Sequence, residues 1–324
     1  MLAHKIPQLK QLLVTTHDRL AAGSHILLIS GDHPDGDSLG SLVGLYHYLQ
    51  ALDKKVTCYA ASTIPEGLQF LPLPEMVFEK NRLPKDIDTA LSFDHSHFSQ
   101  TRLEDWLTEN EPHLINIDHH PGNEMFGHTN VVFPNASSAC ELIYNLYRIN
   151  NIELTKEAAN GLLTGLMTDT GNLGNPATSD TAMAMASALI KYGGKTQKVI
   201  KETFRNKTLP SLKLWGDIIH QIEHNTDLGL AIVVITNEQL KKFNADEEWL
   251  DGLANFLTVL SDAQAIMVIR ELEPGKLRGS FRTTHDNVDV GRLAEIMGGG
   301  GHQKAAGFSV DGRLEKRENC WYIS

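Results

Sequence analysis

The chain has 324 residues, a length that suits two domains better than one, and either domain would be large enough to bury an ordinary core. Hydrophobic residues make up 41% of the sequence and charged residues 21%, a balance typical of a soluble globular protein, and no apolar run approaches the roughly 20 residues that span a bilayer. The formal net charge of -11 opposes the long-range attraction on which binders of long duplex DNA or RNA rely. Any nucleic-acid substrate is therefore expected to be short and held locally.

The first residues and the cysteines indicate the cellular location and exclude several kinds of cysteine site. Residues 1–7 lack the long apolar core and the small-residue cleavage site of a signal peptide, so a cytoplasmic location is expected. Cys58, Cys140 and Cys320 lie far apart with no Cys-x-x-Cys spacing, which argues against zinc knuckles, redox motifs and a disulfide framework. We expect all three to be small buried residues.

Apolar spacing in the first half of the chain predicts alternating helices and strands. A helix over 8–22 ends at Gly23 and feeds a strand at 25–30, and after an Asp-rich turn a second helix begins at Asp37 or Ser38. Strand, polar turn and helix form the opening unit of a doubly wound, mainly parallel sheet. Further strands are predicted at 55–60, 90–93 and 114–117, and further helices at 138–149, 155–167 and 179–191.

The second half repeats α/β character on a smaller scale. Residues 195–225 read as a helical connector, because their composition lacks the Gly and Ser of a flexible linker. Strands are predicted at 230–236, 265–271, 277–282 and 304–310, with helices through 243, at 249–259 and at 291–297. The sequence thus predicts an α/β protein with a first domain at 1–194, a connector at 195–225, a smaller domain at 226–324 and a cleft between the domains.

Polar triplet Asp118-His119-His120 follows the predicted strand at 114–117 and offers three metal-capable side chains. The carboxyl ends of parallel strands are where such sheets bind ligands. Taken alone, the triplet also fits a turn capped by the Asp with one His in the core. Three other element ends carry isolated carboxylates: Asp35 and Asp37, Asp94, and Asp169. Together the four segments predict one metal site.

Some of these carboxylates can also be explained singly, without a metal ion. Asp35-Gly36-Asp37 also fits a solvated turn with Asp37 as a helix cap, whereas Asp169 at the end of an apolar helix opposes the helix dipole and needs a compensating partner. Four carboxylates with one imidazole suit Mn²⁺ or a similar ion, and can hold two divalent ions about 3.5 to 4 Å apart for phosphoester hydrolysis. The set is Asp35, Asp37, Asp94, His119 and Asp169.

A tetraglycine, Gly298 to Gly301, is followed at once by His302. Successive glycine N–H groups can converge on an anion without Cβ clashes, and Arg278 and Arg282 on the preceding strand add phosphate donors. The alternative is a mobile loop with surface cations.

These residues resemble the motifs of the DHH phosphoesterase superfamily, and the resemblance covers nearly the whole chain. The first signal is Asp118-His119-His120, and the second is the run from Gly298 through His302 to Phe308, which resembles the DHH-associated domain. The closest subgroup is NrnA-like, whose members degrade very short RNAs from one end and dephosphorylate 3′-phosphoadenosine 5′-phosphate (pAp). The resemblance implies a phosphoesterase that hydrolyses short oligoribonucleotides, pAp or both with metal-activated water.

The resemblance also implies roles for individual residues. His120 would contact the scissile phosphate, and Asp94, which would bridge two Mn²⁺ ions, and Arg282 would complete the catalytic set. The implied metal ligands are Asp35, Asp37, Asp94, His119 and Asp169, and the implied substrate-binding residues are His120, Arg282, Gly299, Gly300, Gly301 and His302.

One position departs from the family pattern. Where the family places a metal-binding histidine, four residues before the first aspartate, this chain has Gly31. His33 is the favoured replacement and Asp32 the other; without either, one metal ion is expected instead of two. His95 and His97 closely follow Asp94, so they could contact the ligands and orient them; the favoured interpretation is that both are partly exposed loop histidines.

Several functional alternatives stay open at this point. They are a cyclic or linear dinucleotide phosphodiesterase, a polyphosphate or pyrophosphate hydrolase, and a nucleotide-binding protein without catalysis. A homodimer is also open, because sequence does not give the oligomeric state.

Overall fold

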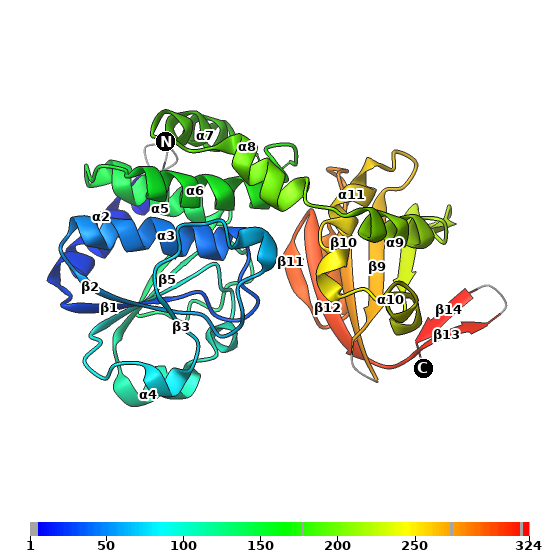
Figure 1. Cartoon of the computed structure of the whole chain (residues 1–324), viewed down its shortest axis with the longest axis horizontal. Coiled ribbons are helices and arrows are strands. Elements are labelled where there is room, and N and C mark those ends of the chain that lie inside the picture. The colour runs from blue at the N-terminus through cyan, green and yellow to red at the C-terminus, as the bar shows by residue number, and fades with distance from the viewer. Residues whose placement is uncertain (1–5, 177, 273–274, 318–319, 324) are drawn as a thin grey trace. The chain divides into compact units, whose positions relative to one another are not determined.

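The computed structural model describes residues 6–176, 178–272, 275–317 and 320–323. The chain forms two compact units, Met1–Asn206 and Lys207–Ser324, which are drawn in Figure 1. The segment 195–225, expected as a connector, contributes residues to both units. Residues 1–5, which belong to the segment without signal-peptide features, and the side chain of Cys320 lie outside the described part of the structure. Within the described ranges, no helix has the length and apolar character needed to cross a membrane.

A six-stranded sheet, parallel throughout, forms the centre of the first unit, in the order β3-β2-β1-β4-β5-β6. This confirms the predicted doubly wound sheet. The order reverses between β1 and β4, which is the point where open parallel sheets bind ligands. The strands are β1 (His25–Ile29), β2 (Lys55–Tyr59), β3 (Met76–Val77), β4 (Thr89–Phe93), β5 (His113–Asp118) and β6 (Thr129–Val132).

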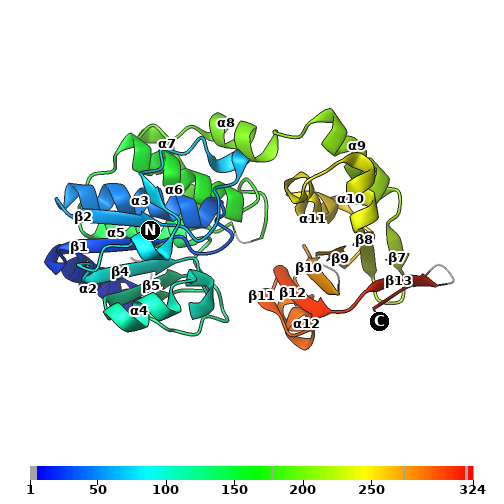
Figure 2. The same ribbon diagram turned by 60° about the horizontal axis from the view of Figure 1, so that its bottom comes forward.

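Helices cover both faces of this sheet (Figures 1 and 2). Alternate strand residues point to opposite faces: Ile26 and Leu28 pack with the helices of one core, while Leu27 and Ile29 pack with Leu107 on the other. The helices are α2 (Pro7–Ala22), α3 (Gly36–Ala51), α4 (Glu104–Asn110), α5 (Ala139–Ile149), α6 (Lys156–Asp169), α7 (Asp180–Lys191) and α8 (Thr196–Val199). Shorter turns are η1 (Glu66–Leu68), η2 (Lys80–Arg82), η3 (Phe98–Thr101) and η4 (Ile200–Phe204), the last a π-helix.

Helices α3 and α6 approach each other through glycines. A Cβ atom on Gly40 would lie 2.4 Å from the carbonyl oxygen of Gly161, and one on Gly165 would lie 2.7 Å from Oδ1 of Asp37. Since real Cβ contacts do not fall below 3.0 Å, the two backbones need glycine to pack this closely. This packing brings the start of α3 against the last turns of α6, the two helix ends that carry Asp37 and Asp169.

The second unit is built on a mixed six-stranded sheet in the order β11-β12-β10-β9-β8-β7, in which only the β8–β9 pair is parallel. Phe281 and Phe308 pack in its core with ring centroids 5.3 Å apart. The helix expected over 249–259 is broken, because Gly252 adopts φ +83° between two short pieces. The elements are α9 (Leu209–Ile219), β7 (Glu223–Asn225), β8 (Leu230–Ile235), α10 (Asn237–Phe243), η5 (Glu247–Leu250), α11 (Leu253–Phe256), η6 (Leu257–Val259), β9 (Ala265–Glu271), β10 (Lys276–Arg282), α12 (Val290–Ile296), β11 (Gly300–His302), β12 (Ala305–Asp311), β13 (Leu314–Arg317) and β14 (Cys320–Ile323).

Candidate active site

His119 lies among carboxylates from three separate elements of the first unit. Its Nε2 atom is 3.1 Å from Oδ2 of Asp169, 3.6 Å from Oδ1 of Asp94 and 3.9 Å from Oδ2 of Asp37. Asp94 follows β4, Asp37 lies in the first turn of α3, and Asp169 is the last residue of α6. The structure therefore brings together four of the five expected ligands, separated by up to 132 positions in the chain.

The start of α3 differs from one of our expectations. Asp35, not Asp37, is the helix cap: its side chain accepts a hydrogen bond from the Ser38 N–H, and the Ser38 hydroxyl in turn binds the Asp35 N–H. Asp37 lies two residues later, in the first turn of the helix, and its two oxygens accept from the N–H groups of Ala139 and Cys140 at 2.6 and 3.0 Å. The start of helix α5 thus stabilises this carboxylate.

Burial and crowding shift the titration of these groups. Burial and the neighbouring Asp169 carboxylate raise the pKa of Asp37 to about 7. Burial and the carboxylates of Asp35 and Asp37 raise the pKa of Asp94 well above its ordinary value. Burial alone would lower the pKa of His119, but the carboxylate of Asp169 holds it well above 6.5. Carboxylates packed this closely repel one another unless a positive charge is placed among them.

The donors present fit a divalent cation. Oδ1 of Asp94 is buried and makes no hydrogen bond to any described residue, and Asp37, His119 and Asp169 each offer a ligand atom within 4.8 Å of the others. A second such group consists of Asp94, Asp118 and His120. Mixed carboxylate and imidazole donors suit borderline and hard divalent ions. The site thus meets the chemical requirement for metal binding.

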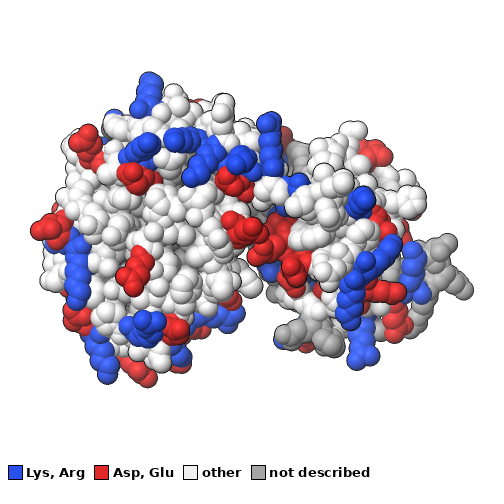
Figure 3. Space-filling model, viewed as in Figure 1, with Lys and Arg blue, Asp and Glu red and all other residues white. Residues whose placement is uncertain are grey.

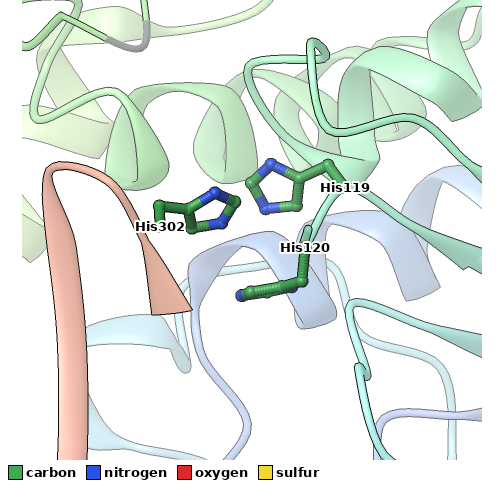
Figure 4. Close-up of side chains that lie close together, drawn as sticks. All are labelled: His119, His120 and His302. Carbon is green, nitrogen blue, oxygen red and sulfur yellow. The ribbon is translucent and has the colours of Figure 1, made fainter. Parts of the chain in front are cut away.

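His120 is oriented by the first member of the triplet. Its Nδ1 atom lies 2.7 Å from Oδ1 of Asp118, whose other oxygen accepts from Asn123 at 2.6 Å. Burial would raise the pKa of Asp118, but the hydrogen bond and the charge of His120 and the bond from Asn123 lower it to about 2. Asp118 is therefore ionised under ordinary conditions and holds the imidazole in one orientation. Figure 4 shows the His119 and His120 rings side by side at the end of β5, with centroids 4.8 Å apart.

The structure does not bring His33 to these carboxylates. Its side chain is 76% exposed, Nε2 lies 3.8 Å from Oδ2 of Asp32, and no group of possible ligands among the described residues includes it. Asp32 itself accepts two hydrogen bonds from the guanidinium of Arg102, at 2.6 and 2.9 Å.

The position of His95 differs from our expectation. We expected a partly exposed loop histidine, but it is buried at 3% exposure beneath the ends of β1 and β4. Burial lowers its pKa to about 4, so the ring is neutral near pH 7. Its proximity to Asp94 in sequence was the only available signal.

The glycines of the second unit have mainly backbone roles. Gly298, with φ +76°, ends helix α12: its N–H binds the Glu295 carbonyl, and that of Gly299 binds the Ala294 carbonyl. These two amides are already engaged, and Gly300 and Gly301 lie on β11, which pairs with β12. His302 follows them on β11 (Figure 4).

Arg282 ends β10 and is held by its neighbours. Its Nε donates to Oδ1 of Asn255 at 2.7 Å, and one terminal nitrogen donates to the carbonyl of Phe281 at 2.8 Å. Asn255 therefore fixes the plane of the guanidinium.

Family models match both units. The DHH family N-terminal domain matches residues 26–166, and the DHHA1 domain matches residues 228–320. The fold and the matched domains define a phosphoesterase of the DHH type. The chain belongs to the DHH family, with a DHHA1 domain following its DHH domain.

Named relatives match most of this chain. The chain is 29% identical over 280 residues to the bifunctional oligoribonuclease and PAP phosphatase NrnA of Thermus thermophilus, covering 86% of this chain and 82% of that protein. It is 28% identical over 303 residues to the protein of the same name from Bacillus subtilis, covering 92% and 91%. A solved structure of an exopolyphosphatase-related protein from Bacteroides fragilis superposes with a TM-score of 0.83 at 24% identity, covering 92% of this chain and 90% of that one, which shows the shared fold.

Proposed function

We propose that this chain is a manganese-dependent phosphoesterase that hydrolyses short oligoribonucleotides and pAp. The observation that carries the proposal is the position of His119 Nε2, between 3.1 and 3.9 Å from carboxylates of three separate elements. Similarity to proteins named oligoribonuclease and PAP phosphatase over most of their length supports the substrates.

Of the proposed ligands, Asp37, His119 and Asp169 form one group of donors, Asp94 belongs to the second group, and Asp35 belongs to neither. We assign metal binding to Asp35, Asp37, Asp94, His119 and Asp169, with Asp94 shared, since its Oδ1 lies 3.6 Å from His119 Nε2 and 3.7 Å from His120 Nδ1. When bound, divalent ions at such a site lower the pKa of water and offset the charge that develops on phosphoryl oxygens. Two ions are proposed. The exposed His33 would join the ligands only after its loop rearranges, and otherwise one ion is expected.

The remaining roles fall to groups that hold the substrate. Because Asp118 engages Nδ1, Nε2 is the His120 nitrogen that we propose donates to a phosphate oxygen. In the second unit, Arg282, Gly300, Gly301 and His302 are proposed to bind phosphate, with Asn255 setting the guanidinium plane.

Surface charge is consistent with a short substrate. On the face shown in Figure 3, acidic and basic side chains are interspersed over the first unit, and the net charge of the chain is -11. Long nucleic acids need an extended basic surface, whereas a dinucleotide needs only local donors.

The decisive experiment is hydrolysis of an end-labelled RNA dinucleotide by purified protein after removal of metal and addition of Mn²⁺, Mg²⁺, Co²⁺ or Zn²⁺ separately. Parallel reactions contain pAp, a cyclic dinucleotide or polyphosphate. Asp94→Ala tests the site, and Glu109→Ala on the exposed surface of α4 is the control for loss of a carboxylate. Mononucleotide release that needs Mn²⁺ and is absent in Asp94→Ala would support the proposal. Turnover confined to polyphosphate, or nucleotide binding without turnover, would overturn it.

A further inference from the structure

Gly31 has no room for a side chain. A Cβ atom there would lie 2.4 Å from Nε2 and 2.6 Å from Cε1 of His95, and 2.5 Å from the carbonyl oxygen of Gln100. The backbone by itself would admit histidine: φ is +63°, a region in which His is enriched among non-glycine residues, and His33 adopts φ +51° two positions later. The exclusion therefore comes from the space that His95 and the Gln100 carbonyl occupy.

The His95 ring is fixed by one hydrogen bond at each nitrogen. Nε2 lies 3.0 Å from the carbonyl oxygen of Ser30, which directly follows β1, and must carry the proton because a carbonyl only accepts. Nδ1 of the neutral ring then accepts from the hydroxyl of Ser92 on β4, at 2.7 Å. With both nitrogens engaged, the imidazole ties two strand ends together and is not available as a metal ligand.

The hydrogen bonds of the His95 ring connect chain segments that carry proposed metal ligands, one after β1 and one after β4. Asp94 directly precedes His95, has φ +60°, and its N–H donates to the carbonyl of Ile117 on β5. Ser30 leads into the loop before α3, and Asp35 and Asp37 lie at the start of that helix. A left-handed residue at the end of a strand keeps its conformation only when its surroundings hold it, and the His95 ring anchors the chain next to Asp94 through its bonds to Ser30 and Ser92.

We propose that His95 is a positioning residue of the metal site: its imidazole fills the side-chain space of residue 31, joins the ends of β1 and β4, and fixes Asp94 relative to the start of α3, where Asp35 and Asp37 lie. A corollary is that this site takes no ligand from position 31. The inference rests on the proposed metal binding and identifies what holds the ligands in place.

The test is Mn²⁺ binding measured by isothermal titration calorimetry on the full chain, with thermal unfolding in EDTA recorded for the same variants. His95→Ala is expected to weaken Mn²⁺ binding at least tenfold. His95→Gln keeps an N–H donor for the Ser30 carbonyl and is expected to recover most of that affinity. His25→Ala is the matched control, because His25 is also buried and hydrogen-bonded between β1 and β2, to Thr57, but at the opposite end of the strand.

A positioning role is supported if His95→Ala weakens Mn²⁺ binding while His25→Ala lowers only the unfolding temperature. Equal Mn²⁺ affinity in wild type and His95→Ala, or equal losses in the two alanine variants, would overturn it. Absence of Mn²⁺ binding by the wild-type protein would instead contradict the proposed function, so the two failures are distinguishable.

A second pair of variants tests whether the His95 ring fills the space of residue 31; if chains without the ring do not fold, Gly31→Ala compared with Gly122→Ala, where a Cβ meets nothing within 4 Å, carries the test. Gly31→Ala pushes against the His95 ring, so it is expected to weaken Mn²⁺ binding, and the effect is expected to be smaller in a His95→Gly background than alone. Equal effects of Gly31→Ala in the two backgrounds would show that the His95 ring does not occupy the space of residue 31 in solution.

Discussion

The Nδ1 atom of His120 lies 2.7 Å from Oδ1 of Asp118, in a pair whose carboxylate also accepts from Asn123. Asn123 in turn accepts from Asn116 and donates to the carbonyl of His95. Asp118 therefore orients the imidazole of His120, and through Asn123 the network connects this pair to the loop after β4.

Asp118→Asn is expected to lower kcat by about 10 to 100-fold with a smaller change in KM, because the imidazole loses its charged partner while the shape of the site is kept. Steady-state kinetics at saturating metal on whichever substrate is turned over will measure this. Unchanged kcat would show that the orientation of His120 does not depend on the carboxylate.

Asp37→Ala and Asp169→Ala are expected to differ in stability even without metal. Asp37 accepts two buried N–H groups from the start of α5, and leaving them unpaired costs about 1 to 3 kcal/mol for each group. The side chain of Asp169 is 28% exposed and ends α6, where a negative charge is unfavourable, and removing that charge offsets the loss of its 3.1 Å contact with His119. Urea unfolding in EDTA should therefore show a large loss for the first variant and a small change for the second. Similar losses would contradict the structural role of Asp37.

Metal-free protein is expected to lose stability as pH rises from about 4 to about 8. Asp37, with a folded-state pKa of about 7, binds more protons folded than unfolded, so stability falls as pH rises from its unfolded value of 3.8 through 7. His119, whose pKa is raised, contributes stability that is present below pH 6.5 and lost as pH rises through its folded value. Asp118, with a pKa of about 2, acts in the opposite direction only below about pH 4.

Divalent metal should reverse this trend, because a cation offsets the repulsion that the carboxylates develop on ionisation. Thermal unfolding with EDTA and with Mn²⁺ at several pH values will show whether the Mn²⁺-induced rise in Tm grows between pH 5 and 8. A rise that is independent of pH would indicate that the cation does not bind at these carboxylates.

Gly40→Ala is expected to destabilise the first unit by about 1 to 3 kcal/mol, because the new methyl group would press on the Gly161 carbonyl in the α3–α6 contact. Gly122→Ala is the control in the same unit, since nothing lies within 4 Å of its Cβ position. Chemical unfolding of both variants measures the difference, and equal stability would mean that the helices separate at little cost.

Sequence patterns predicted the strands that form the middle of the first sheet, since buried parallel strands are continuous apolar runs. They did not predict β3 and β6, which are short edge strands of two and four residues. Of the candidate site, the carboxylates and His119 were identifiable because polar residues stand out at strand and helix ends. The burial of His95 was not, because it depends on contact with Ser30, 65 positions earlier in the chain. Likewise, only the fold reveals that the start of α5 stabilises Asp37 and leaves Asp35 as the cap.

The dispersal of the site along the chain has a consequence for synthesis on the ribosome. Asp37 emerges early, but the helix start that satisfies its carboxylate begins at Ala139, and the glycine-lined surface of α6 that packs on α3 follows later. A nascent chain that stops before Lys156 therefore contains the sheet but lacks both Asp169 and the α3–α6 contact that brings the proposed ligands together. Competence to bind a metal ion should arise late in translation of the first unit, at the length where α6 leaves the exit tunnel.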